Sequence, residues 1–153
     1  MLTFRFAEPS DADLIAPLLR RNDALEVIRA GHGHIIPAMR RSVEESKKGG
    51  MAGLFLDDGQ PVALFGVAPK LGIGIPWLVG TDAINLHQKT FLKETRFWVR
   101  QWQRNYPLLM NHVDASYSGA IRWLSWLGFS IGTPQPIGLA GAMFCRFEMQ
   151  GGL

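Results

Sequence analysis

The sequence is poor in the residues that build disulfide frameworks, membrane spans and disordered segments. Its 153 residues include one cysteine, Cys145, which excludes an intramolecular disulfide framework and is typical of a reducing compartment. No apolar run is long enough to cross a membrane, and residues 1–5 lack the features of a signal peptide. Only 19% of the residues are charged and 47% are hydrophobic, as in a globular chain. We therefore expect a single domain over residues 1–153, in the cytoplasm.

Several segments have the patterns of strands and helices. Residues 2–7 alternate as a strand does. Ser10 and Asp13 resemble a capping box and predict a helix that continues to Leu19. Residues 57–61 contain the Asp-Gly pair that favours a hairpin turn. The other expected elements are helices at about 38–48, 83–105 and from 120 onward, and strands at about 51–56, 62–67, 75–79, 108–113 and 142–149.

These elements follow one another in the order β-α-α-β-β-β-α-β-α-β. No repeat, linker or low-complexity tract interrupts them. Because strands and helices are mixed along the whole chain, we expect an α/β (α+β) fold, with a mixed central sheet of about six to seven strands and helices on both faces.

The run from Ala120 to Phe129 is the most informative segment. Its apolar residues recur at helical spacing, and Gly128 stands where a helix ends in a left-handed residue. Any amphipathic helix that stops at glycine has this pattern. The run also resembles the sequence Ala-Ile-x-Leu-Tyr-x-x-x-Gly-Phe of GNAT-type N-acetyltransferases, whose order of elements is the one predicted above. The resemblance implies a V-shaped cleft where strands 75–79 and 108–113 splay apart.

Within that superfamily, the chain is similar to small GNAT-like proteins of short-tailed bacteriophages. Those proteins are grouped with internal virion and virion-assembly proteins. The shared features are the Trp77-Leu78-Val79 strand, the Thr81-Asp82 turn into a charged helix, and Ile121-Arg122-x-Leu124 before the helix stop. The likeness implies that other phage virion proteins are partners. It places the protein in the host cytoplasm or in the virion.

The resemblance also indicates where acetyl-CoA would bind. In the family, a Gly-rich turn at the start of the long helix lets backbone N–H groups surround the pyrophosphate. The corresponding stretch is about residues 86–91, which contains no glycine and ends in the bulky Phe91. We therefore expect no bound cofactor, and acetyl-CoA is the one that the resemblance allows. The candidate cofactor-binding residues are His87, Gln88, Lys89 and Thr90.

Acid–base groups are scarce in the same region. Active family members usually have a tyrosine where this chain has Leu124, and that tyrosine protonates the departing thiolate. The candidate catalytic residues are Asp82, which is also explained as a helix N-cap, and Tyr117, two helical turns before Leu124. The His32-Gly33-His34 segment does not predict a metal site, because no third ligand is nearby. Cys145 lies in an apolar alternation and is interpreted as a core thiol.

The long helix has two contrasting faces. Trp98 and Trp102 share one face with Phe91 and are expected in the core. The opposite face is predicted to be a basic ridge made of Lys89, Lys93, Arg96, Arg100 and Arg104. Such a ridge is either an ordinary solvated face or a contact surface for nucleic acid or an acidic partner, and the formal net charge of +3 permits both.

Two hypotheses of function follow. In the first, the acetyl-CoA site is degenerate and the protein acts in virion assembly, or as an internal virion component, through protein contacts. In the alternative, it is an acetyl-CoA-dependent N-acetyltransferase of unknown acceptor. The leucine at position 124 and the missing glycines favour the first.

Overall fold

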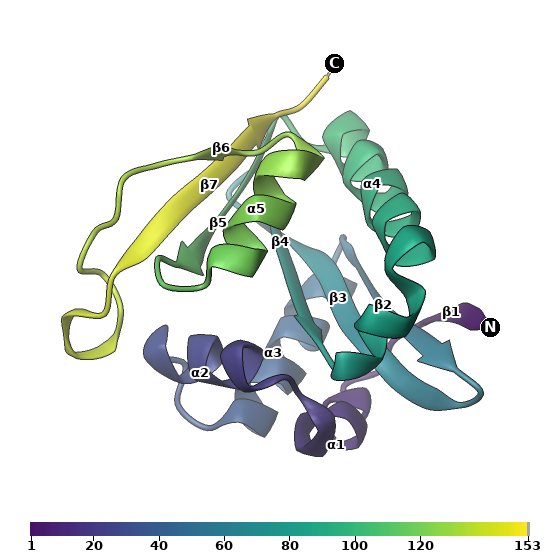
Figure 1. The fold of residues 1–153 in the computed structure, drawn as a ribbon. Helices are drawn as coiled ribbons and strands as arrows, with labels where there is room; N and C mark the ends of the chain where they lie inside the picture. Colours follow the sequence, from purple (N-terminus) through teal and green to yellow (C-terminus); the bar gives the residue numbers. More distant parts are fainter. Residues whose placement is uncertain (153) are drawn as a thin grey trace.

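A seven-stranded sheet forms the centre of the molecule, with the strands in the order β1-β2-β3-β4-β5-β7-β6 (Figure 1). The computed structural model describes residues 1–152. All neighbouring strands are antiparallel except β4 and β5, which are parallel. The strands are β1 (Leu2–Phe6), β2 (Met51–Asp57), β3 (Gln60–Lys70), β4 (Ile73–Gly80), β5 (Leu108–Asp114), β6 (Ser130–Ile131) and β7 (Phe144–Gln150). The predicted mixed sheet is confirmed.

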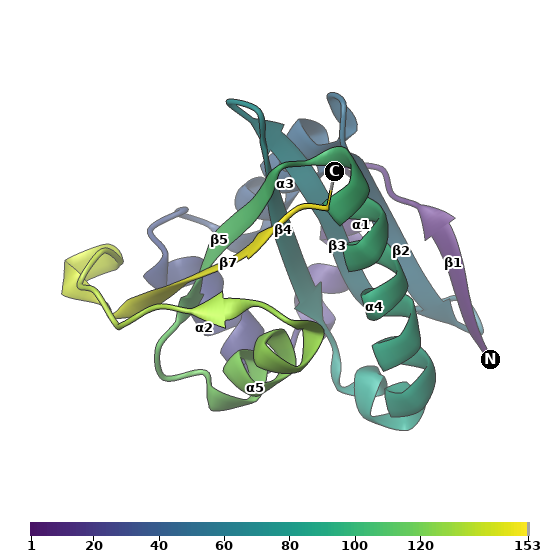
Figure 2. The ribbon, with the colours of Figure 1, turned by 90° about the horizontal axis from the view of Figure 1, so that it is seen from above.

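Helices cover both faces of this sheet, as predicted (Figures 1 and 2). One face carries α1 (Asp11–Ile15), α2 (Arg21–Arg29) and α3 (Ile35–Lys47), and the other carries α4 (Gln88–Asn105) and α5 (Ser118–Leu127). Short 3-10 helices are η1 (Ala16–Leu18), η2 (Asp82–His87) and η3 (Leu139–Gly141). No helix within residues 1–152 combines the length and hydrophobicity that a membrane crossing requires.

The alternation of side chains along β2 and β3 creates two cores. Leu54 and Leu64 are fully buried on the face covered by α1 and α3. Phe55 and Phe65 point to the opposite face, where their rings stack with centroids 4.9 Å apart beneath α4. Because both faces of these strands are buried, they contain runs of apolar residues rather than the polar alternation of an edge strand.

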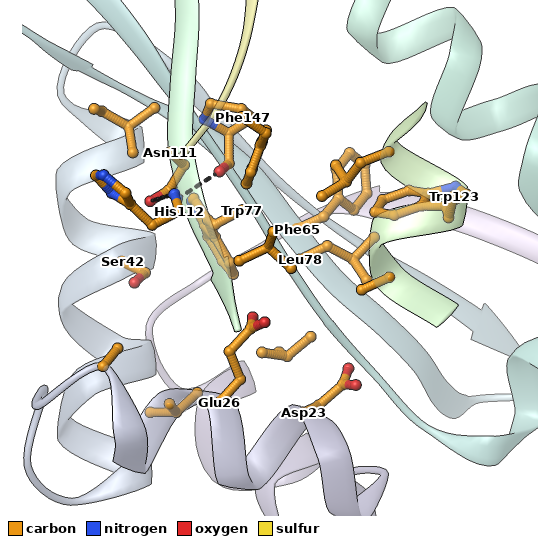
Figure 3. Close-up of a pocket in the computed structure, with 18 of the residues that line it drawn as sticks. Asp23, Glu26, Ser42, Phe65, Trp77, Leu78, Asn111, His112, Trp123 and Phe147 are labelled. Carbon is orange, nitrogen blue, oxygen red and sulfur yellow. Dashed lines mark hydrogen bonds between the residues drawn. The ribbon is translucent and has the colours of Figure 1, made fainter. Parts of the chain in front are cut away.

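The sheet divides between β4 and β5. The two strands pair at one position, Gly74 with Leu109. Pro76 follows on β4 and has no N–H to donate, and its carbonyl accepts a bond from the Asn111 side chain instead (Nδ2 to O, 2.8 Å; Figure 3). The C-terminal ends of β4 and β5 are therefore free to diverge, and the predicted splay is confirmed.

Some predicted boundaries are wrong. The helix expected from Ser10 to Leu19 ends at Ile15, since Pro17 lacks an N–H, and Ser10 makes no capping bond with its side chain. A further helix, α2, follows that the sequence did not indicate. The long helix expected over 83–105 is α-helical only from Gln88 and is preceded by η2, whose first turn is capped by Thr81 (Ala83 N to Thr81 Oγ1, 3.2 Å).

The predicted end of α5 is confirmed, and it gives a stability test. Gly128 has φ +108°, a left-handed conformation that costs other residues about 1–2 kcal/mol. Gly128→Ala should lower the free energy of unfolding by about that amount in denaturant titrations. Gly119→Ala is the matched control, because Gly119 lies inside the same helix with room for a Cβ atom. It should leave stability unchanged or raise it by up to about 1 kcal/mol. Equal losses of stability in both variants would contradict the left-handed conformation assigned to Gly128.

Candidate active-site cleft

A cavity of about 1190 Å³ occupies the gap between the splayed strands. It passes from the face of α2 and α3 to the face of α4 and α5. Asp23, Glu26 and Ser42 line it on the first side, and Phe91 and Trp123 on the second. Figure 3 shows the Asp23 and Glu26 carboxylates projecting from α2 toward this space. The cleft therefore has a polar end at α2 and an aromatic end beneath α4 and α5.

Two carboxylates of α2 hold the ends of the two strands. Asp23 Oδ2 accepts a hydrogen bond from the backbone N–H of Gly80, at the end of β4 (2.6 Å). Glu26 Oε2 accepts one from the backbone N–H of Asp114, at the end of β5 (3.0 Å). Residues three apart lie on the same face of a helix. One turn of α2 therefore bridges the mouth of the cleft.

The charge of Asp23 is compensated. Its carboxylate is 4% exposed and accepts bonds from the Arg20 guanidinium (3.0 and 3.2 Å) and from the Tyr117 hydroxyl (2.5 Å). Burial, and then the adjacent Asp23 carboxylate, raise the pKa of the Tyr117 phenol well above its usual value. Tyr117 therefore stays protonated at neutral pH, with its hydrogen directed to Asp23.

Glu26 differs from its neighbours because no cation is bonded to it within residues 1–152. Asp114 is paired with Arg29 (2.9 Å), as Asp23 is with Arg20. Burial raises the pKa of Glu26 from 4.5 to about 7, and the charges of Asp23 and Asp114 act in the same direction, whereas the Asp114 N–H opposes them. A carboxylate with a pKa near 7 suits a general base at neutral pH.

The structure places the two sequence candidates for catalysis apart. Tyr117 lines the cleft, on the side of α2. Asp82 is exposed and lies outside the residues that line the cleft. Leu124 is 6% exposed and packs in the aromatic core, so the position of the family's acid is filled by a buried hydrocarbon side chain.

The four candidate cofactor residues lie where η2 meets α4. His87 is held by Asp57 of β2 (Nε2 to Oδ2, 2.9 Å), and Gln88 lines the cleft. Lys89 and Thr90 are exposed in the first turn of α4, which has no side-chain cap. The amides of η2 bond within their own turn, Ala83 and Ile84 both to Thr81. The first turn of α4 is thus the part of this segment that can meet an anion.

Three tryptophans line the aromatic end of the cleft, and their indole N–H groups are buried in its wall without a hydrogen-bond partner among residues 1–152. The three are Trp98, Trp102 and Trp123. These N–H atoms are closed off from the cleft, so a ligand in it does not reach them in this conformation. The rings offer a coenzyme aromatic walls rather than hydrogen-bond donors. At the pyrophosphate end, Phe91 is buried and stacked on Trp123 (6.2 Å), which narrows the room for phosphate groups.

Asp23 and Glu26 were missed by the sequence analysis. The signal that could have found them is the Asp-x-x-Glu spacing, preceded by Arg20, which pairs with Asp23 on one helical turn. No group of three potential metal ligands occurs within residues 1–152. The prediction that Cys145 is a buried core thiol is confirmed.

Comparison with known proteins identifies the fold. No protein-family model and no curated sequence matches the chain. Among solved structures, a GNAT-family acetyltransferase from Streptococcus pneumoniae is similar, with a TM-score of 0.69 and 16% identity over 99% of this chain and 100% of that one. Ribosomal-protein-alanine N-acetyltransferase from Brucella melitensis has a TM-score of 0.70 and 16% identity over 97% and 99% of the two chains. A phosphinothricin acetyltransferase from Sinorhizobium meliloti, in complex with acetyl-CoA, has a TM-score of 0.70 and 13% identity over 99% and 89%. The fold is that of the GNAT N-acetyltransferases, as the sequence resemblance implied.

The raised pKa of Glu26 predicts a pH-dependent stability. The folded state binds the Glu26 proton more tightly than the unfolded state does, and this difference contributes to the free energy of unfolding. The contribution is complete below pH 4.5 and is lost as the pH rises through about 7. Because glutamine does not ionise, the variant Glu26→Gln does not lose this stability as the pH rises. Its stability relative to wild type should therefore increase by up to about 3 kcal/mol between pH 4.5 and 8 in urea titrations. Glu44→Gln, an exposed change on α3, is the matched control for the loss of one carboxylate. A constant difference for Glu26→Gln would refute the raised pKa.

Proposed function

We propose that the protein is an acyl-CoA-dependent N-acyltransferase in which Glu26 is the general base. The observation that supports this most directly is the position of Glu26 at the mouth of the cleft, with a pKa of about 7. An amine acceptor must lose a proton as it is acylated, and a base with a near-neutral pKa takes that proton most effectively.

The other residues of the cleft have supporting roles. Glu26 Oε2 is fixed by the Asp114 N–H, so Oε1 is the oxygen left to accept a proton. Arg20 forms a salt bridge with Asp23 and the Tyr117 hydroxyl donates a hydrogen bond to it, so this carboxylate is held in place on α2. When bound, acetyl-CoA would supply an activated acyl thioester. The rings of Trp98, Trp102 and Trp123 would pack against its pantetheine arm, and Lys89 would lie near its phosphates.

The general acid of the family has no equivalent here. Leu124 has no proton to give, and the Tyr117 hydrogen is donated to Asp23 on the opposite side of the cleft. A positioned acid contributes about 10²–10⁴-fold to a proton-transfer step. We therefore propose a slow enzyme, rather than one with the usual acid and base together.

The virion-assembly role implied by the phage resemblance stays a prediction. It requires protein contacts and no turnover. It becomes the preferred function if the protein neither binds acetyl-CoA nor releases coenzyme A.

Coenzyme A release from acetyl-CoA, measured with a panel of primary amines, tests the proposal. The wild-type rate should rise with pH and level off above about pH 7, since Glu26 must be ionised to act as a base. Glu26→Gln should lower the rate by about 10²-fold or more and abolish this rise. Glu44→Gln is the control for loss of one surface carboxylate and should keep the wild-type profile.

Thermal unfolding with and without acetyl-CoA completes this test, because a ligand of the native state must raise its stability. A wild-type protein that shows neither a thermal shift nor turnover would refute the enzyme. Equal turnover in wild type and Glu26→Gln would refute the role of Glu26 as the base but not the enzyme activity itself.

Restoring the acid should increase the rate. Leu124→Tyr places a hydroxyl at the family's position, and Leu124→Phe adds the same ring without the hydroxyl. The tyrosine variant should be at least about 10-fold faster than the phenylalanine variant, because only tyrosine can protonate the leaving thiolate. Melting temperatures of both variants control for overpacking of the core. Equal rates in two folded variants would show that this position no longer faces the reacting atoms.

A further inference from the structure

The outward face of α4 is uniformly basic. Residues 89–104 place five cations within about 80° around the helix axis, over a length of about 22 Å. Figure 2 shows α4 on the outside of the molecule, with its inner side against the sheet. These residues define the α4 basic face, and all are exposed except Arg96, which is half-buried: Lys89, Lys93, Arg96, Arg100 and Arg104. The predicted ridge is thus on the surface, opposite the buried Trp102.

The cations of this face are not neutralised by the protein. None of the five forms a salt bridge within residues 1–152, whereas seven arginines and lysines elsewhere do. Glu94 is the one acidic residue of α4, and it has no salt-bridge partner on the helix. A single-sign row of free charges creates a potential that attracts a polyanion.

Exposed aromatic rings accompany the charges. Trp126 of α5 is 45% exposed, and the Arg96 guanidinium lies over its ring at 4.0 Å from the centroid. Phe97 is 51% exposed on the neighbouring position of α4. Acidic protein surfaces and duplex DNA need only the charges. Exposed rings among the charges suit the unstacked bases of a single strand, which stack on aromatic side chains.

We propose that the α4 basic face, together with Trp126 and Phe97, binds single-stranded nucleic acid. The basic residues contact the phosphates, and the two rings stack on bases. The inference does not depend on the enzyme proposal, because only Lys89, in the first turn of α4, is shared with it. The other four cations point away from the cleft, which Trp98 and Trp102 line from the inner side of the same helix.

Fluorescence anisotropy with a labelled 20-nucleotide oligothymidylate is the direct test. Five phosphate contacts should make the affinity fall about a hundredfold between 50 and 200 mM salt. The variant Arg96→Gln/Arg100→Gln/Arg104→Gln should bind more weakly, and its affinity should fall only about sevenfold over the same range. The control variant Arg21→Gln/Lys48→Gln/Lys70→Gln removes the same charge away from α4 and should behave as wild type. No binding at 50 mM salt, or equal losses in both triple variants, would overturn the proposal.

A second variant separates stacking from charge. Trp126→Leu keeps every cation and should weaken binding of the oligonucleotide about five- to a hundredfold, with the salt dependence unchanged. Poly-glutamate and a 20-base-pair duplex are the competing probes. Either one binding as tightly as the single strand, or an unaltered affinity in Trp126→Leu, would overturn the assignment to single-stranded nucleic acid. A melting temperature for each variant confirms that it is folded.

Discussion

The shape of the cleft depends on two hydrogen bonds from α2. Strands β4 and β5 stop pairing after Gly74 and Leu109, so their last amides need other acceptors. Asp23 and Glu26 supply these acceptors from adjacent positions on one helical turn. The same contact that keeps the strands apart therefore buries two carboxylates at the mouth of the cleft. One of them is neutralised by Arg20, and the other keeps a pKa near 7.

The opposite end of the cleft is organised by aromatic packing. Phe91 contacts Phe55 and stacks on Trp123, so it belongs to the core between α4, α5 and the sheet. The bulky residue that replaces a glycine in the family pattern is thus a structural part of this molecule. Any coenzyme must approach through the space left beside this aromatic cluster. The cleft is present, and the segment where the family pattern has its glycines spans the end of η2 and the first turn of α4.

Local signals predicted the fold well, and long-range contacts account for what was missed. The hairpin at Asp58-Gly59 and the stop at Gly128 depend on backbone conformations that a few residues determine, and both were predicted. Helix α2 has no side-chain cap, and its key contacts reach 57 and 88 residues along the chain. Neither its position nor the pKa of Glu26 can be predicted from neighbouring residues. The absence of an acid at Leu124 was visible in the sequence, because it concerns only which side chain is present.

The proposed enzyme, with a base but no general acid, is consistent with the chemistry of a thioester. A thiol has a pKa of about 8.5, so a thiolate can leave near neutral pH without full protonation in the transition state. An aliphatic ammonium group, with a pKa of about 10.4, must lose its proton before it can attack. Transfer to an amine therefore depends more on a base than on an acid. Under the proposed function, a site with Leu124 in place of the tyrosine and with Glu26 against the end of β5 would supply the more demanding half of the chemistry.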